Sequence, residues 1–213
     1  MDWTVIPKNF TFLIEGLLVS FQLAGLTVAF ALPIGCLIAL GRLSSRKWIY
    51  YHATVFVNGL RANTLVLIVF WFYFLVPIII GRPIGDFVSV LIAFVIFFSA
   101  YFAEIVRTGI QSIGKGQIWA GYSIGLTYFQ TMRYVVLPPA LKRMVPLLAT
   151  LTIILFQGTT IAFVIGIKEF LHRTSLVAGR TLLSFELYIF AALVYFVICY
   201  FGSYVSSRLE VKR

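Results

Sequence analysis

Charged side chains are scarce in this chain. Of its 213 residues, only 11% are Asp, Glu, Lys or Arg, whereas 61% are hydrophobic. A soluble domain carries about 25% charged residues. Because so few polar groups cannot cover a water-exposed surface, we expect the chain to be embedded in a lipid bilayer.

Acidic residues, cysteines and histidines are rarer still. There are 7 acidic residues, 2 cysteines and 2 histidines. Cys36 and Cys199 lie in apolar stretches, where we expect them to pack as free thiols. Neither His52 nor His172 has an evident Ser, Cys or metal-ligand partner, and a disulfide framework or metal site needs more members. We therefore expect no catalytic residues, no metal and no cofactor in this chain.

The basic residues exceed the acidic ones, with 17 Lys and Arg against 7 Asp and Glu. In a soluble protein this surplus suggests nucleic acid or another anionic surface. In a membrane protein it is typical of connections on the cytoplasmic side. The apolar composition favours the second interpretation, with lipid and not nucleic acid as the partner.

Five stretches without charge are candidates for crossing a bilayer, namely residues 16–41, 62–81, 87–103, 144–167 and 187–207. About 20 apolar residues span the hydrocarbon core. The second stretch can begin before Arg61 and the third can continue past Glu104. We therefore predict an all-α integral membrane protein, a single domain over 1–213, with five transmembrane helices. Their predicted ranges are 16–41, 54–81, 87–106, 144–167 and 187–207.

The distribution of Lys and Arg predicts the orientation. One set of connections contains eleven: Arg42, Arg46, Lys47, Arg107, Lys115, Arg133, Lys142, Arg143, Arg208, Lys212 and Arg213. The other set contains five: Lys8, Arg82, Lys168, Arg173 and Arg180. Because basic residues accumulate on the cytoplasmic side, we expect the N-terminus outside the cell and the C-terminus in the cytoplasm.

The stretch GIQSIGKGQ, residues 109–117, has the spacing of a phosphate-binding loop but lacks its last element. Such a loop follows a strand and ends in Lys and then Ser or Thr, whose hydroxyl binds magnesium. Here Gly116 occupies the hydroxyl position, and a predicted membrane helix precedes the stretch. We interpret it as a glycine-rich turn leaving that helix, not as an ATP site.

The long connection 108–143 carries a periodic apolar pattern. Its members are Trp119, Tyr122, Leu126, Phe129 and Met132, at spacings of 3, 4, 3 and 3. The pattern predicts one helical face, or two short helices broken near Gly125. We expect the helix to end at Leu137, Pro138 and Pro139, because proline disrupts a helix interior.

The segment from 109 to 148 contains a distinctive set of residues: Gly109, Ile113, Gly116, Gln117, Ala120, Gly125, Leu126, Thr127, Gln130, Leu137, Pro138 and Ala140. With these residues it resembles the cytoplasmic loop of permease subunits of type I ABC importers, most narrowly those for polar amino acids. The likeness extends to the segments 70–73, 100–107 and 155–160. Some positions depart from the family pattern: Trp119 stands where the family has Glu, and Gly121, Thr64, Pro139 and the segment 158–160 also differ. They indicate a divergent member, or one half of an asymmetric pair.

The resemblance implies an assembly in the bacterial inner membrane, with the N-terminus periplasmic. Two permease subunits, a second copy or a sister chain, would enclose the path. A periplasmic binding protein would deliver the substrate, and a separate ATPase dimer would bind ATP and Mg. A coupling helix between the third and fourth transmembrane helices would dock on that ATPase. The residues implied in this coupling are Gly116, Gln117, Trp119, Ala120, Tyr122, Gly125, Leu126, Phe129, Leu137 and Pro138.

Polar residues in the spans are candidates for the substrate path, since they are costly in lipid and usually face the interior. They are Gln22, Asn58, Arg61, Thr64, Gln157, Thr159 and Thr160. Arg61 suits a carboxylate, but it can also snorkel to the interface or pair with Glu104. Thr159 and Thr160 can also bond to carbonyls of their own helix.

The Phe156-Gln157 pair resembles the glutamate/aspartate permeases, so we expect an acidic amino acid as the substrate. Glutamine, histidine and arginine remain alternatives. Two other classes are an ion-coupled secondary transporter and a non-transporting scaffold. The first usually shows internal repeats and ionisable groups deep in its spans, and the second lacks a reason for the coupling-loop resemblance.

Overall fold

The computed structural model describes residues 2–211, and every regular element in this part of the chain is a helix, with no strand. Lys212 and Arg213, which were counted in predicting the orientation, lie outside the described residues. Within the described residues, four helices are long and apolar enough to cross a membrane: α2 (Phe10–Arg42), α6 (Asp86–Gln111), α9 (Leu137–Gly158) with the helical turns that precede and follow it, and α11 (Ser184–Val211). A fifth span exists if a bent pair of helices is counted as one.

The bent pair occupies the range predicted as the second span, 54–81. Helix α3 (Lys47–Arg61) meets the helix formed by α4 (Leu65–Phe70), η1 (Trp71–Leu75) and α5 (Val76–Ile80) at 104°. The continuous helix expected there is therefore broken. Thr64 has extended backbone, with φ −88° and ψ 147°, so one helix ends before it and the next begins after it.

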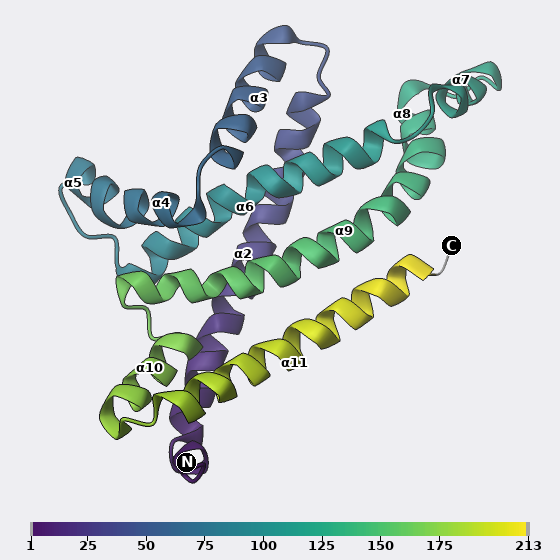
Figure 1. Ribbon diagram of the computed structural model, residues 1–213. Helices are drawn as coiled ribbons and strands as arrows, with labels where there is room; N and C mark the ends of the chain where they lie inside the picture. The colour runs from purple at the N-terminus through teal and green to yellow at the C-terminus, as the bar shows by residue number, and fades with distance from the viewer. Residues whose placement is uncertain (1, 212–213) are drawn as a thin grey trace.

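Figure 1 shows α6, α9 and α11 side by side, with α2 crossing them. The most extensive packing joins α2 to α6. Ala31, Gly35 and Ala39 recur every four residues on α2, and Ala31 and Ala39 are fully buried. A Cβ atom built on Gly35 would lie 2.7 Å from Cβ of Phe102. In lipid, where apolar burial drives association weakly, such small residues allow backbones to approach and pack.

The main core lies where these helices meet, around Leu23, Phe94, Phe102 and Leu155. By contrast, α11 leaves large apolar side chains exposed along its length: Leu193, Phe196, Val197, Tyr200 and Phe201. An apolar outer surface is what a lipid-embedded helix needs.

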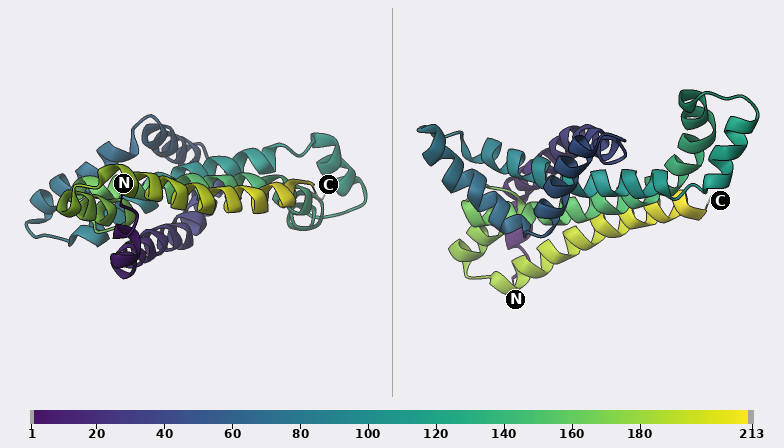
Figure 2. Two further views of the ribbon diagram at one scale, coloured as in Figure 1. Left: turned by 60° about the horizontal axis from the view of Figure 1, so that its bottom comes forward. Right: turned by 90° about the horizontal axis from the view of Figure 1, so that it is seen from above.

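The segment 115–136 forms a separate unit beyond the ends of α6 and α9 (Figures 1 and 2). It consists of α7 (Lys115–Ser123), α8 (Tyr128–Gln130) and the π-helical η2 (Thr131–Val136). Gly125 separates α7 from α8 with φ +83°, a conformation that favours glycine. Two short helices broken near Gly125 were one of the two forms predicted from the spacing.

The expectation that the helix ends at Pro138 and Pro139 is wrong. The helical path runs from Tyr128 to Ile165 without a gap, through η2, α9 and the 3-10 helix η3 (Thr159–Ile165). The prolines lie in the first turn of α9, directly after the π-helical turn. Because a π-helical turn already departs from the regular i→i−4 hydrogen bonding, the missing N–H of proline removes less of the helical ladder here.

At the other end of α2, a buried carboxylate holds three helices together. Glu169 precedes α10 (Phe170–Thr181) and accepts hydrogen bonds from the backbone N–H groups of Leu171 (2.9 Å) and His172 (2.7 Å). It also accepts from the hydroxyls of Ser20 on α2 and Tyr195 on α11. Glu169 is fully buried, and this burial raises the pKa of its carboxyl. The short α1 (Val5–Lys8) packs at the same end.

Candidate functional site

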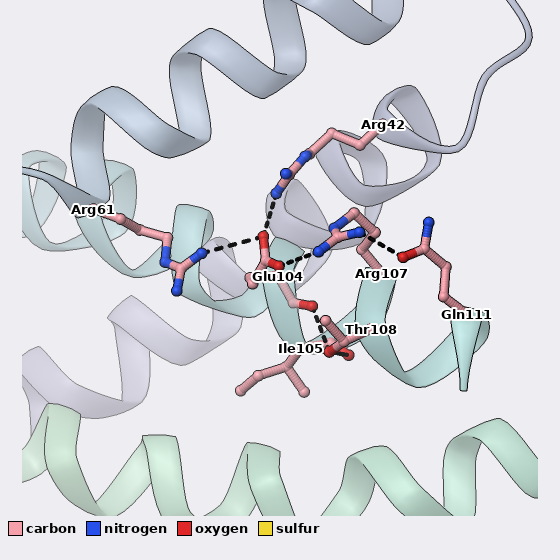
Figure 3. Close-up of polar contacts among 7 residues, drawn as sticks. All are labelled: Arg42, Arg61, Glu104, Ile105, Arg107, Thr108 and Gln111. Carbon is pink, nitrogen blue, oxygen red and sulfur yellow. Dashed lines mark hydrogen bonds and ion pairs between the residues drawn. The ribbon is translucent and has the colours of Figure 1, made fainter.

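A carboxylate with three arginines stands where α2, α3 and α6 converge; we call Glu104, Arg42, Arg61 and Arg107 the Glu104 cluster (Figure 3). Arg42 belongs to the last turn of α2, and Arg61 is the last residue of α3. Glu104 and Arg107 lie one turn apart on α6. The cluster therefore ties together the ends of two helices and the side of a third.

The three arginines contact the carboxylate unequally. Arg42 Nη1 and Arg107 Nη2 make close ion pairs with Glu104 Oε2 and Oε1, respectively. Arg61 Nη1 is 3.3 Å from Oε2. The exposed fraction rises from 8% for Arg42 to 22% for Arg107 and 39% for Arg61. Arg61 is thus the most accessible and the most loosely held of the three.

The surroundings of Arg61 add a second contact. Its guanidinium carbon lies 5.6 Å from the centre of the Tyr101 ring, a cation–π distance. The helix break at 62–64 follows directly, where Asn63 donates its side-chain amide to the Gly59 carbonyl at 2.7 Å. Arg61 pairs with Glu104, which was one of the two alternatives to a role in the substrate path.

The other predicted path residues fall into two groups. Gln22, Asn58, Thr64 and Gln157 are exposed on the surface of this single subunit, and each remains a prediction as a path residue. Thr159 and Thr160 donate hydrogen bonds to the carbonyls of Phe156 (2.7 Å) and Gln157 (2.9 Å), respectively. These are the contacts within their own helix that the sequence left open, and Thr159 is fully buried.

The structure places most of the predicted coupling residues on exposed surface of the 115–136 unit. Trp119 and Phe129 are 66% and 70% exposed, and the rings of Trp119 and Tyr122 lie 6.3 Å apart. Gly116, Gln117, Ala120, Gly125 and Pro138 are also exposed, whereas Leu126 and Leu137 are half-buried. Within the unit, Thr127 caps the N-terminus of α8. Its hydroxyl accepts a hydrogen bond from the Gln130 N–H, and the Gln130 side chain accepts one from the Thr127 N–H.

Several residues of both regions were not singled out from the sequence. Ile124, Tyr128 and Tyr134 are exposed on the same unit as Trp119 and Phe129. Large apolar side chains in a loop predicted to face water indicate a contact surface, and this signal could have identified these three residues. Arg42 and Arg107 were counted only as cytoplasmic charges, and no spacing rule connects them to Glu104.

Comparisons with known proteins agree with this architecture. Residues 31–212 match the family described as "Binding-protein-dependent transport system inner membrane component". The glutamate/aspartate import permease protein GltK of Escherichia coli O157:H7 is 35% identical over 216 residues, covering 98% of this chain and 96% of that protein. The probable glutamine ABC transporter permease protein GlnP of Bacillus subtilis (strain 168) is 34% identical, covering 97% and 95%.

A solved structure supports the same grouping. The crystal structure of an amino acid ABC transporter with histidines superposes with a TM-score of 0.94 at 31% identity, covering 100% of this chain and 99% of that one. The family assignment decides against an ion-coupled secondary transporter and against a scaffold. The chain belongs to the family of binding-protein-dependent transport system inner membrane components, as a multi-pass permease subunit of an amino-acid ABC importer that is not itself catalytic.

Proposed function

We propose that this permease imports acidic amino acids, glutamate and aspartate, into the cytoplasm. Similarity alone does not choose a substrate, since the relatives for glutamate/aspartate and for glutamine are 35% and 34% identical. The observation that carries the proposal is the Glu104 cluster, in which three guanidinium groups meet one carboxylate. A cationic surplus among apolar helices attracts anionic substrates and disfavours cationic ones.

The proposed transport cycle uses two permease subunits, a second copy of this chain or a sister. A periplasmic binding protein delivers the amino acid to the path between them. We expect the path to be lined by the predicted polar residues, of which Arg61, Asn58, Thr64, Gln157 and Gln22 are exposed on this subunit; Thr159 and Thr160 belong to the same predicted set. Access alternates between the two sides as the paired bundles rock about the central site.

The proposed drive comes from a separate ATPase dimer, which binds ATP and Mg. The 115–136 unit docks into a cleft on this ATPase through its exposed aromatic side chains, including Trp119 and Phe129. Large aromatic anchors in a groove carry much of the binding energy at such contacts. In the predicted orientation this unit lies on the cytoplasmic side, where ATP is available.

Uptake by reconstituted vesicles tests the substrate class. The complex purified on this chain is placed in proteoliposomes with ATP inside and the binding protein outside, and uptake of labelled glutamate is measured against excess unlabelled competitors. Competition by aspartate, but not by glutamine, histidine or arginine, is expected. Competition by glutamine together with direct glutamine uptake would instead identify a glutamine importer, the second candidate, which the similarity to GlnP supports.

A further inference from the structure

The Glu104 cluster carries more positive than negative charge. Glu104 Oε2 is shared by Arg42 and Arg61, and Oε1 is taken by Arg107. Among the described residues, no ion pair brings a second carboxylate to any of these arginines. Three cations therefore share one anion, so an additional anion at this position would be stabilised.

Arg61 is the member that can exchange its partner. Its contact with Glu104 is the longest of the three at 3.3 Å, and it is the most exposed, at 39%. When the Arg61 side chain moves away from Glu104, Glu104 keeps the close ion pairs with Arg42 and Arg107. Neither charge is then buried alone, and an exposed ion pair contributes little to stability.

The other two arginines keep their ion pairs with Glu104. Arg42 is 8% exposed at the end of α2, and Arg107 also donates a hydrogen bond to Gln111 Oε1 on its own helix. Both lie on helices that pack closely with each other. They fix the carboxylate of Glu104, and Arg61 approaches this fixed group from the end of α3 (Figure 3).

The guanidinium of Arg61 selects the chemistry of its alternative partner. Its planar fork matches a carboxylate in a two-point contact. The Tyr101 ring, 5.6 Å away, supports the cation and leaves its N–H groups for an anion. Every amino acid carries a carboxylate on its α-carbon, and an acidic amino acid carries a second one in its side chain.

We propose that Glu104 is an internal substitute for the substrate's carboxylate. The Glu104 carboxylate pairs with the Arg61 guanidinium in the state seen here, and a carboxylate of the incoming amino acid takes its place in that ion pair. This inference rests on the proposed import of carboxylate-bearing substrates. Because one carboxylate replaces another, Arg61 is paired before and after binding. Glu104 then acts as a built-in competitor, which lowers the affinity of the path for the substrate and eases release.

Direct binding to the permease complex tests the exchange. Labelled glutamate is titrated onto the detergent-solubilised complex purified on this chain, without binding protein. Removing the competitor with Glu104→Gln is expected to tighten binding about fivefold, the scale of an exposed ion pair. Arg61→Gln is expected to abolish binding, and the double variant is expected to match Arg61→Gln, because the effect of Glu104 acts through Arg61.

Asp86→Asn is the matched control, since Asp86 is an exposed carboxylate at the opposite end of the same helix; its binding is expected to equal wild type. Weaker binding by Glu104→Gln overturns the proposal, as does an undiminished Glu104→Gln effect in the Arg61→Gln background. So does the absence of saturable binding of both glutamate and glutamine in wild type and Glu104→Gln alike. If the Glu104→Gln complex does not assemble, Arg61→Lys decides: weaker binding supports the two-point contact, and unchanged binding contradicts it.

Repeating the titration with labelled glutamine separates this inference from the proposed function. If glutamate fails to bind and Glu104→Gln tightens glutamine binding, the exchanged group is the α-carboxylate. The acidic-substrate proposal then fails while the exchange stands.

Discussion

Arg42 at the end of α2 and Glu104 on α6 form a close ion pair across 62 residues of sequence, and Arg42 is almost completely buried. The pair joins the two helices that pack most extensively in the fold. Breaking a buried pair leaves its remaining partner with fewer compensating charges, which is costly in a low-dielectric environment. Two other arginines remain beside Glu104 and reduce that cost.

We predict that Arg42→Gln destabilises the permease by about 2 kcal/mol, somewhat less than the loss of an isolated buried pair. Arg61→Gln is expected to cost at most about 1 kcal/mol, because Arg61 is partly exposed and loosely held. The thermal unfolding midpoints of the purified variants check this order. Equal losses of stability for the two substitutions would show that the burial of these arginines does not determine how much each contributes to stability.

The close contact of α2 with α6 at Gly35 gives a second prediction. A Cβ at this position would lie 2.7 Å from Phe102 Cβ and 2.9 Å from the Ser99 carbonyl oxygen, so the helices must move apart. Gly35→Ala is expected to destabilise by about 1–3 kcal/mol, as overpacking does. Gly25→Ala on the same helix is the control, because a Cβ there would meet no neighbouring element within 4 Å. A Gly35→Ala protein as stable as Gly25→Ala would contradict the packing argument.

The turn at Gly125 shows what the sequence predicts well. Glycine near the centre of an otherwise periodic stretch indicated a break, and the structure places the break there with a positive φ. The prolines at 138 and 139 show the opposite case. Proline usually ends a helix, yet the preceding π-helical turn lets α9 begin with them. Nothing in the local composition signals a π-helical turn.

The Glu104 cluster was only half predictable. A charge within a span needs a partner, so the sequence suggested Glu104 for Arg61. That Arg42 and Arg107 join them depends on how α2, α3 and α6 meet in space, which a single sequence does not show. The bend of 104° at residues 62–64 was missed for a related reason: an apolar run marks a membrane segment but not its direction.

The exposed aromatic side chains of the 115–136 unit predict a specific assembly defect. The double substitution Trp119→Ala and Phe129→Ala removes two anchors that are 66% and 70% exposed, so the chain itself should fold. The amount of ATPase that co-purifies with the permease is then expected to fall at least tenfold, since aromatic hot spots each contribute about 2 kcal/mol or more to binding. Trp48→Ala, which removes a 74% exposed ring on α3, is the control and should retain the ATPase. Full retention by the double variant would refute docking through these rings.

The carboxyl of Glu169 predicts a pH dependence of stability. Burial raises its pKa above the ordinary value of 4.5, so the folded state holds this proton more tightly than the unfolded chain. Its contribution to stability is therefore present below pH 4.5 and is lost as the pH rises through the raised pKa.

Thermal unfolding of wild type and Glu169→Gln across this pH range measures the effect. Gln keeps acceptor capacity for the N–H groups of Leu171 and His172 but does not titrate. The stability of wild type relative to Glu169→Gln should fall as the pH rises above 4.5. A difference that is flat, or that grows with pH, would contradict the assignment to this carboxyl.

ATP hydrolysis by the complex purified on this chain tests the central claim most directly. The complex is reconstituted in lipid with its binding protein, and glutamate and aspartate are compared with glutamine, histidine and arginine. We predict stimulation by the acidic pair alone, with the stimulation lost in Arg61→Gln. Stimulation by glutamine, histidine or arginine but not by the acidic pair would contradict the proposed import of acidic amino acids.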